Sequence, residues 1–257
     1  MIIEDISKQK TINGVIHLTE PDKSLEDLYL KYLMKEKRLY IDDEVKLLPY
    51  ASEKNPHKDE WALRTKSFLR FKDYLSKKKS TLNILDLGCG NGWFTAQLAK
   101  EFDHNYFCID TNLVELEQAA RLFSKDNISF FYADITKASF PTNTFHIIII
   151  NSCLQYFPEI ENLLKECFTI SKSYGEVHII DTPFYKANEI MLARNYSLKH
   201  FTSLGLPEMT KKYYHHTIKE LKYFRYRYLY NPDLLKNKLT SFIFEKDSPY
   251  PWIMVTR

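Results

Sequence analysis

The fold of this chain is decided by the stretch Asn83-Ile84-Leu85-Asp86-Leu87-Gly88-Cys89-Gly90-Asn91-Gly92. A short apolar run contains an acid near its end, and three glycines follow at alternate positions. The segment from Trp93 to Lys100 then has the pattern of a helix. A strand, a tight glycine turn and a helix start, in this order, are typical of α/β proteins that bind adenosine-containing ligands. Glycine is needed in such a turn because a side chain would block the close approach of backbone and ligand.

The spacing of the glycines distinguishes between ligands. The dinucleotide fingerprint G-x-G-x-x-G would place its third glycine at position 93, where this chain has Trp93. The pattern is instead D-x-G-x-G-x-G, from Asp86 to Gly92. With this motif the chain resembles the class I, Rossmann-like S-adenosylmethionine-dependent methyltransferases. The resemblance implies S-adenosyl-L-methionine as cofactor, S-adenosyl-L-homocysteine as product, and a mostly parallel seven-stranded sheet with helices on both faces.

Length, charge and cysteine content set broad limits. The 257 residues can form one large α/β domain, and a net charge of +3 does not by itself indicate nucleic acid or an acidic membrane as partner. The four cysteines are far apart in sequence and form no C-x-x-C pair, so we expect buried, reduced thiols and no metal site. The first ten residues lack an apolar signal region, and the run from Phe145 to Ile150 is too short to cross a bilayer. We therefore expect a cytoplasmic protein without a membrane partner.

Strand and helix patterns alternate from residue 82 onward, which predicts right-handed crossovers and a parallel sheet. The expected strands are 82–87, 105–109, 128–133, 145–150 and 175–180, and the expected helices between them include 113–124 and 159–171. Before this region, apolar stripes predict helices over 24–37, with Ser24 as N-cap, and over 59–75. We expect residues 1–80 to form a helical N-terminal extension and residues 81–257 to form the cofactor-binding domain.

The alternation of strands and helices ends after the fifth predicted strand. Residues 182–222 contain short amphipathic pieces rich in Tyr, Phe and Met, and we interpret them as a lid over the carboxyl ends of the strands. Residues 224–230, 241–245 and 252–256 look like strands, the last two joined by a turn, and the resemblance implies a terminal antiparallel hairpin. Aromatic and basic residues alternate within 224–230, which predicts a half-buried strand with one solvated face.

Three acids lie at the ends of the first three predicted strands. The resemblance places Asp86 beside the methionine end of the cofactor and Asp134 at the adenine amino group. Asp110 ends the second strand, where a carboxylate can accept both ribose hydroxyl protons in strong, charge-assisted bonds. A single acid at a strand end is more often a cap or a surface residue, but three in register with the glycine motif indicate a cofactor site.

The predicted cofactor site contains more than the three acids. Its other members are Gly88, Cys89, Gly90, Asn91, Gly92, Thr111, Ile135, Asn151 and Arg64. Arg64 lies on the helix before the sheet, where it pairs either with the cofactor carboxylate or only with solvent. Asn151 begins the segment Asn151-Ser152-Cys153-Leu154-Gln155-Tyr156, which the resemblance places beside the transferable methyl group.

The candidates for catalysis are few, because methyl transfer requires a base only when the nucleophile must lose a proton. Tyr156 takes the place of a histidine found in small-molecule relatives, and it either orients the substrate or is a structural aromatic. His215 and His216, in the predicted lid, are candidate bases. The segment after Asn151 is not the Asn/Asp-Pro-Pro-Tyr/Phe motif of enzymes that methylate amino groups of bases or glutamine, which disfavours that class.

The sequence thus predicts an enzyme that transfers a methyl group from S-adenosyl-L-methionine to a small or medium-sized metabolite, at O, N or C. Two alternatives remain open: an RNA methyltransferase, and a non-catalytic cofactor-binding module. Basic and aromatic residues interleave from Lys211 to Tyr228, which is compatible with RNA, but the period of two within 224–230 favours an ordinary strand. A nicotinamide-dependent dehydrogenase is a more distant alternative. The acceptor and the oligomeric state do not follow from the sequence.

Overall fold

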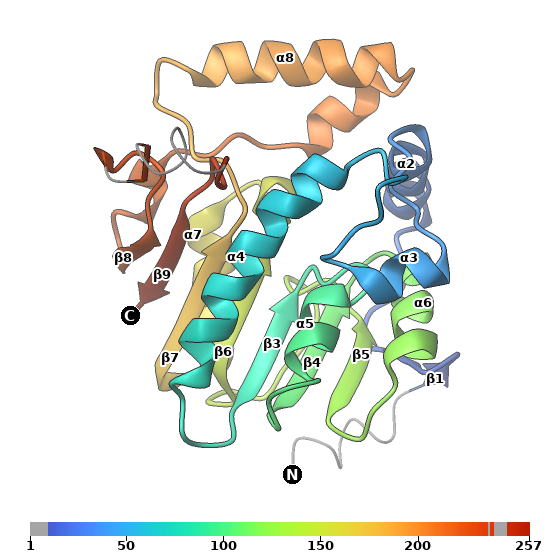
Figure 1. Cartoon of the computed structure of the whole chain (residues 1–257), viewed down its shortest axis with the longest axis vertical. Helices are drawn as coiled ribbons and strands as arrows, with labels where there is room; N and C mark the ends of the chain where they lie inside the picture. Colours follow the sequence, from blue (N-terminus) through green and yellow to red (C-terminus); the bar gives the residue numbers. More distant parts are fainter. Residues whose placement is uncertain (1–9, 236, 239–245) are drawn as a thin grey trace.

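The computed structural model describes residues 10–235, 237–238 and 246–257 of the chain. One mixed sheet runs through it, with nine strands among the described residues, in the order β1-β2-β5-β4-β3-β6-β7-β9-β8. Figure 1 shows helices on both faces, with α4 and α5 in front of the sheet and α7 behind it. The strands are β1 (Thr11–Ile12), β2 (Val15–His17), β3 (Asn83–Leu87), β4 (Asn105–Asp110), β5 (Ile128–Tyr132), β6 (Phe145–Asn151), β7 (Ser171–Ile180), β8 (Arg225–Tyr230) and β9 (Trp252–Thr256). The helices are α2 (Lys23–Lys35), α3 (Asp42–Leu47), α4 (Lys58–Ser76), α5 (Trp93–Leu98), α6 (Leu113–Phe123), α7 (Ile160–Ile170) and α8 (Ile190–Ser203), with short 3-10 helices η1 (Leu154–Tyr156), η2 (Pro207–Lys212) and η3 (Ile218–Leu221).

The five strands predicted from the alternating pattern form the parallel centre of the sheet. β3 pairs with β4 on one side and with β6 on the other, and β5 and β7 follow outward, all in parallel. The isoleucines Ile147–Ile150 of β6 are buried, as expected for a parallel strand covered on both faces. The chain order reverses between β3 and β6, and ligands bind outside the carboxyl ends of the strands at such a switch point.

The N-terminal region departs from the prediction of a purely helical extension. β1 pairs with β2 in an antiparallel hairpin, and β2 pairs in parallel with β5. These two strands extend the sheet to nine strands, so the expected number of seven is wrong. The hairpin turns at Asn13 and Gly14, whose φ angles are 49° and 81°. Asn-Gly is a strong hairpin signal, but the strands beside it are too short to show an alternating pattern.

Helices α2 and α4 form where the apolar stripes predict them. The predicted N-cap Ser24 is wrong, because the carboxylate of Asp22 accepts the N–H of Leu25 at 3.2 Å and caps α2. A carboxylate at this position also interacts favourably with the helix dipole. On α4, Phe71 is fully buried and packs against Phe94 and Trp252 at ring distances of 5.5 and 5.8 Å. These contacts fix α4 on the sheet and so place the residues of its first turns.

The C-terminal strands complete the other edge of the sheet. β9 pairs antiparallel with both β7 and β8. Of the two strands expected to form a terminal hairpin, β9 corresponds to the second. The predicted strand 241–245 lies outside the described residues. The predicted half-buried face of β8 is wrong for Tyr226 and Tyr228, which are 40% and 41% exposed. Their exposure follows from the position of β8 as the outermost strand.

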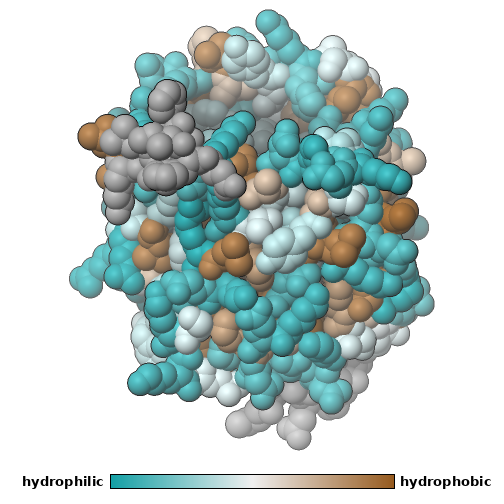
Figure 2. Space-filling model, viewed as in Figure 1, coloured by the Kyte–Doolittle hydropathy of each residue, from teal (hydrophilic) through white to brown (hydrophobic). Residues whose placement is uncertain are grey.

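The segment interpreted as a lid lies beyond the carboxyl ends of the strands. Figure 1 shows α8 at the top of the molecule, above the ends of the central strands and on the same side as α2. Phe201 of α8 packs against Tyr32 of α2 at a ring distance of 5.6 Å, so the lid segment and the N-terminal region meet above the sheet. On the face shown in Figure 2, apolar residues are scattered among hydrophilic ones rather than gathered in one patch.

Two further expectations concern the cysteines and the membrane. Cys89, Cys108, Cys153 and Cys167 are all buried free thiols, as predicted. Among the helices of the described ranges, none combines the length and apolar character that crossing a bilayer requires.

Replacement of Phe71 by alanine tests the packing of α4 on the sheet. We expect Phe71→Ala to lower the free energy of unfolding by about 3–5 kcal/mol, because it opens a cavity between α4, α5 and β9. Leu69→Ala on the same helix is the matched control, since Leu69 is 43% exposed, and it should cost less than about 1 kcal/mol. Urea unfolding measures both, and equal losses would contradict the packing described.

Candidate functional site

The glycine turn follows β3 and leads into α5. Gly88 has a φ of 72°, and a side chain there would place its Cβ 2.6 Å from the Sγ of Cys153. Gly92 also has a φ of 72°, and its missing side chain leaves room for Ala119 of α6 and for the ring of Phe130. Gly92 therefore allows the close packing of the turn on α6, and Gly88 allows Cys153 to pack closely against the end of β3.

The residues of this turn line a cavity of about 760 Å³ at the carboxyl ends of the strands. This volume lies within the usual range for small-molecule and cofactor sites. All predicted cofactor residues except Gly92 line the cavity, namely Asp86, Gly88, Cys89, Gly90, Asn91, Asp110, Thr111, Asp134, Ile135, Asn151 and Arg64. Tyr156 lines it as well. The structure thus brings to one place residues that are far apart in the sequence.

Asp110 connects the glycine turn to the neighbouring strand. One oxygen of its carboxylate accepts the Gly90 N–H at 2.7 Å, and the other accepts the N–H groups of Thr111 and Asn112 at 2.7 and 2.9 Å. Burial raises the pKa of Asp110, while these three bonds act to lower it. A carboxylate has about four acceptor positions, so the oxygen facing Gly90 retains the capacity for a further donor such as a ribose hydroxyl.

The other two predicted acids have different environments. Asp86 is buried in β3 and accepts a bond from the Thr95 hydroxyl at 2.7 Å, and burial raises its pKa to about 7. Asp134 follows β5 and closes a local turn by accepting from both the N–H and the hydroxyl of Thr136, at 3.0 and 2.7 Å. Burial acts to raise the pKa of Asp134, but these bonds and the ion pair with Lys137 hold it below its usual value.

Arg64 belongs to the cavity wall. Its guanidinium donates to Glu60 at 2.8 Å and to the Ser152 hydroxyl at 2.9 Å. Glu60 also accepts from Arg38 at 2.7 Å, so one carboxylate lies between two guanidinium groups. Burial acts to raise the pKa of Glu60, but its two arginine partners lower it to about 2. Glu60 thus stays ionised and holds both arginines in place beside the cavity.

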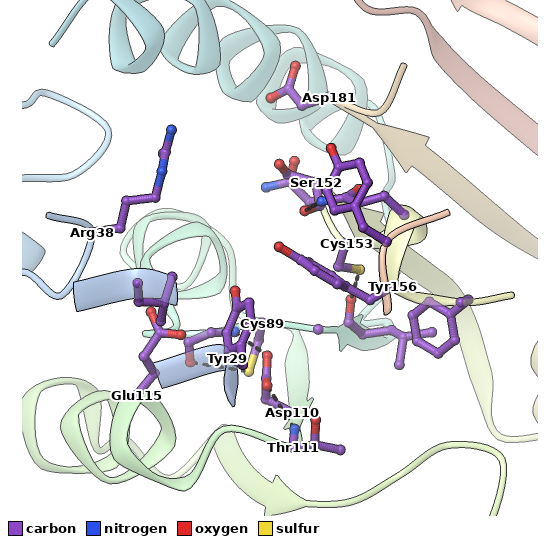
Figure 3. Close-up of a pocket in the computed structure, with 18 of the residues that line it drawn as sticks. Tyr29, Arg38, Cys89, Asp110, Thr111, Glu115, Ser152, Cys153, Tyr156 and Asp181 are labelled. Carbon is purple, nitrogen blue, oxygen red and sulfur yellow. Dashed lines mark hydrogen bonds between the residues drawn. The ribbon is translucent and has the colours of Figure 1, made fainter. Parts of the chain in front are cut away.

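Tyrosine rings form much of the remaining wall. Tyr156 of η1 packs edge-to-face against Tyr29 of α2 and Tyr213 of the lid segment, at ring distances of 5.3 and 5.9 Å. Figure 3 shows Tyr29 and Tyr156 close together, with Ser152 and Asp181 beyond them. Burial raises the pKa of all three phenols, so they remain protonated at neutral pH. Such rings can orient a substrate, but they do not accept its proton.

The two predicted bases are elsewhere. His215 pairs with the Ser197 hydroxyl at 2.8 Å, and His216 lies 3.0 Å from a Glu220 oxygen and 3.2 Å from the Leu154 carbonyl. Among the residues that the structure describes, neither imidazole lines the cavity. The arrangement gives both rings structural partners in the lid segment, and their catalytic role remains a prediction without geometric support.

Several residues of the cavity were missed by sequence reasoning. Glu115 of α6 is buried beside the glycine turn and accepts from the Asn112 amide at 2.7 Å. Burial and the nearby Asp110 raise the pKa of Glu115 to about 8. Three more cavity residues come from the N-terminal region, namely Tyr29, Arg38 and Glu60. No motif in the sequence indicates that their side chains belong to a site. Asn112 is the N-cap of α6, and the position of Glu115 three residues later was the only indication of Glu115 in the sequence.

Comparison with known proteins agrees with this arrangement. Residues 84–175 match the family model described as a methyltransferase domain. The sterol 24-C-methyltransferase erg6 of Aspergillus fumigatus is 27% identical over 113 residues, which are 41% of this chain and 30% of that protein. The malonyl-[acyl-carrier protein] O-methyltransferase of Acetivibrio thermocellus is 31% identical over 98 residues, or 38% of this chain and 34% of that protein. The chain thus spans about a third of the length of these relatives.

Solved structures show the same fold over more of the chain. The YcgJ protein of Bacillus subtilis has a TM-score of 0.56 at 12% identity and covers 75% of this chain and 99% of its own. The plantazolicin methyltransferase BpumL, solved with a desmethyl substrate analogue and S-adenosylhomocysteine, has a TM-score of 0.51 at 16% identity, over 91% of this chain and 99% of its own. The fold and the matched motif define a methyltransferase domain. Residues 84–175 of the chain thus match the methyltransferase family, and the fold over more of the chain is that of the solved structures.

Replacement of Asp110 by asparagine tests the cofactor site. We expect Asp110→Asn to weaken S-adenosylhomocysteine binding by roughly 10- to 100-fold, because a charge-assisted bond contributes about 1.5–3 kcal/mol. Calorimetric titration measures the change, with the exposed Asp126→Asn as a control of equal charge. An unchanged affinity in Asp110→Asn would remove Asp110 from the site.

The raised pKa of Glu115 predicts how the free energy of unfolding depends on pH. Because its folded-state pKa is about 8 and its ordinary value is 4.5, the folded protein holds a proton that the unfolded chain releases between these values. The contribution of Glu115 to the free energy of unfolding is therefore present at low pH and is lost as the pH rises to about 8. Glu115→Gln should reduce this decline, by an amount on the order of a few kcal/mol.

Denaturant unfolding of the cofactor-free protein at pH 5.5 and pH 8.5 provides the measurement. The exposed Glu208→Gln is the matched control and should keep the decline of the wild type. If Glu115→Gln declines as steeply as the control, Glu115 is ionised in the folded protein at neutral pH.

Proposed function

We propose that this protein transfers a methyl group from S-adenosyl-L-methionine to a small or medium-sized metabolite. The observation that carries the proposal is the shared cavity: the glycine turn and the strand-end acids line the same cavity as residues of α2, η1 and the lid segment. A cofactor bound along the turn would thus face an acceptor space built from the rest of the chain. The family and its metabolite-methylating relatives support this interpretation.

The residues present fit the cofactor. Asp110 has acceptor capacity left for a ribose hydroxyl, Asp134 lies at the next strand end for the adenine amino group, and Gly88 and Gly90 of the turn line the same cavity. Arg64 is available for the methionine carboxylate, since it lines the cavity and Glu60 compensates only part of the charge of the two arginines. When bound, S-adenosyl-L-methionine supplies a methyl group that is already activated on a sulfonium sulfur.

The remaining task of the chain is to orient the acceptor and to exclude water. Holding two reactants in line can contribute about 7–11 kcal/mol to lowering the barrier. Tyr29, Tyr156 and Tyr213 are packed against one another, so they form a firm wall for that purpose. We propose that residues 182–222 act as the lid that completes this wall. The buried free cysteines support a reducing compartment, and we propose the cytoplasm.

Methyl transfer from labelled S-adenosyl-L-methionine provides the test. We expect label to enter low-molecular-weight compounds of a metabolite extract with the wild type and with Asp126→Asn, and to fall at least tenfold with Asp110→Asn. An RNA fraction is tested in parallel at low and high salt, because binding to RNA would be steeply salt-dependent. Label in RNA alone would contradict the proposed acceptor class. Cofactor binding without transfer to either fraction would indicate a non-catalytic module.

A further inference from the structure

Three side-chain oxygens in the wall of the cavity have no hydrogen-bond partner within the described part of the chain. One is Oδ1 of Asn151, a predicted cofactor residue, and the other two are Oδ2 of Asp181 and Oε1 of Gln155. Asp181 and Gln155 have exposed fractions of only 7% and 8%. A buried acceptor without a donor costs about 1–3 kcal/mol, and more when it is charged. These oxygens are therefore suited to a ligand that brings hydrogen-bond donors.

The backbone holds Asp181 beside the end of β6. Ser152, directly after β6, donates its N–H to the Ile180 carbonyl at 2.9 Å, which joins the two strand ends. Ser152 and Asp181 have positive φ angles of 56° and 50°, which are uncommon for residues other than glycine. Neighbouring left-handed residues at two strand ends show that tertiary contacts impose this conformation on the cavity wall.

Among the described residues, donors reach only one oxygen of Asp181. Its Oδ1 accepts the hydroxyl of Ser67, on α4, at 2.6 Å and the hydroxyl of Ser248 at 3.3 Å. These two bonds orient the carboxylate and leave Oδ2 without a donor. Gln155 is held in the same way, since its amide nitrogen donates to the Ser152 carbonyl at 2.8 Å while Oε1 remains unpaired. Figure 3 shows Asp181 near Ser152 in the wall of the cavity.

The charges and rings around these oxygens favour a cation over an anion. Glu60 engages both Arg38 and Arg64, and the methionine carboxylate that we assign to Arg64 would occupy the charge that remains, so neither guanidinium is left for an anionic acceptor. Asp181 is the further acid of this wall, and no donor of the described residues reaches one of its oxygens. Neutral tyrosine rings add the attraction of their π faces for a positive charge.

We propose that Asp181 and Gln155 form a subsite for a protonated amine on the acceptor molecule. The ammonium donates hydrogen bonds to Asp181 Oδ2 and Gln155 Oε1, and the tyrosine wall around Tyr156 contacts the apolar part that bears it. The proposal rests on the methyltransferase function proposed above, because it takes the cofactor to occupy the glycine side of the cavity. It names the recognition group of the acceptor and leaves open which atom is methylated.

The experiment uses probes of one shape and different charge. With the protein saturated by S-adenosylhomocysteine, ligand-observed NMR titrations compare 2-phenylethylamine as its ammonium form, 2-phenylethanol and phenylacetate. We expect the ammonium to bind at least tenfold more tightly than the alcohol or the acid. Asp181→Asn keeps an oxygen for Ser67 and Ser248 but removes the charge, and it should lower ammonium affinity at least tenfold. Asp126→Asn should leave that affinity unchanged.

The titration with S-adenosylhomocysteine separates the two proposals. Failure of the wild type to bind it overturns the proposed function. If the wild type binds S-adenosylhomocysteine normally but binds phenylacetate or 2-phenylethanol as tightly as the amine, only the amine subsite is overturned. Asp181→Asn should bind S-adenosylhomocysteine within threefold of the wild type. A tenfold loss there would assign Asp181 to the amino group of the cofactor and would also overturn the acceptor subsite.

Discussion

The hydrogen bond between the Gly90 N–H and the Asp110 carboxylate, at 2.7 Å, is the contact on which the site depends. It ties the turn after β3 to the end of β4, the neighbouring strand, and two further N–H groups fix the same carboxylate. The shape of the turn is therefore set by the protein itself and not by a ligand. Such pre-organisation lowers the entropy that binding must remove, which increases affinity.

The acids of the cavity illustrate how function and stability compete. Asp86, Glu115 and Asp181 are buried and Asp110 is half-buried, and desolvation is the main reason why their pKa values are raised. A core built only for stability would hold apolar residues at these positions. Several titratable groups with raised pKa values around one cavity are typical of functional sites.

The central sheet and the cofactor side of the site were predictable because their signals are local. The glycine spacing, the apolar runs and the acids after them lie in consecutive segments, and parallel pairing brings those strand ends together. The N-terminal strands were not predicted, because β2 is only three residues long and is stabilised by pairing with β5. Tyr226 and Tyr228 fit a half-buried pattern, but the outermost position of β8 exposes them.

The acceptor side was less predictable because tertiary packing decides it. Tyr29 lies on an apolar stripe that equally well describes a core helix, and only its contact with Tyr156 places it at the cavity. His215 and His216 are typical catalytic residue types, yet Ser197 and Glu220 engage their rings away from the cavity. Asp181 matters because one of its oxygens has no donor, which no sequence pattern records.

A crystal structure of the protein with S-adenosylhomocysteine would test the central claim most directly. The account predicts that a ribose hydroxyl lies within hydrogen-bonding distance of Asp110 and that the nucleoside rests against the turn between Gly88 and Asn91. A nucleoside bound away from the ends of β3, β4 and β5, or no bound nucleoside at saturating concentration, would contradict it.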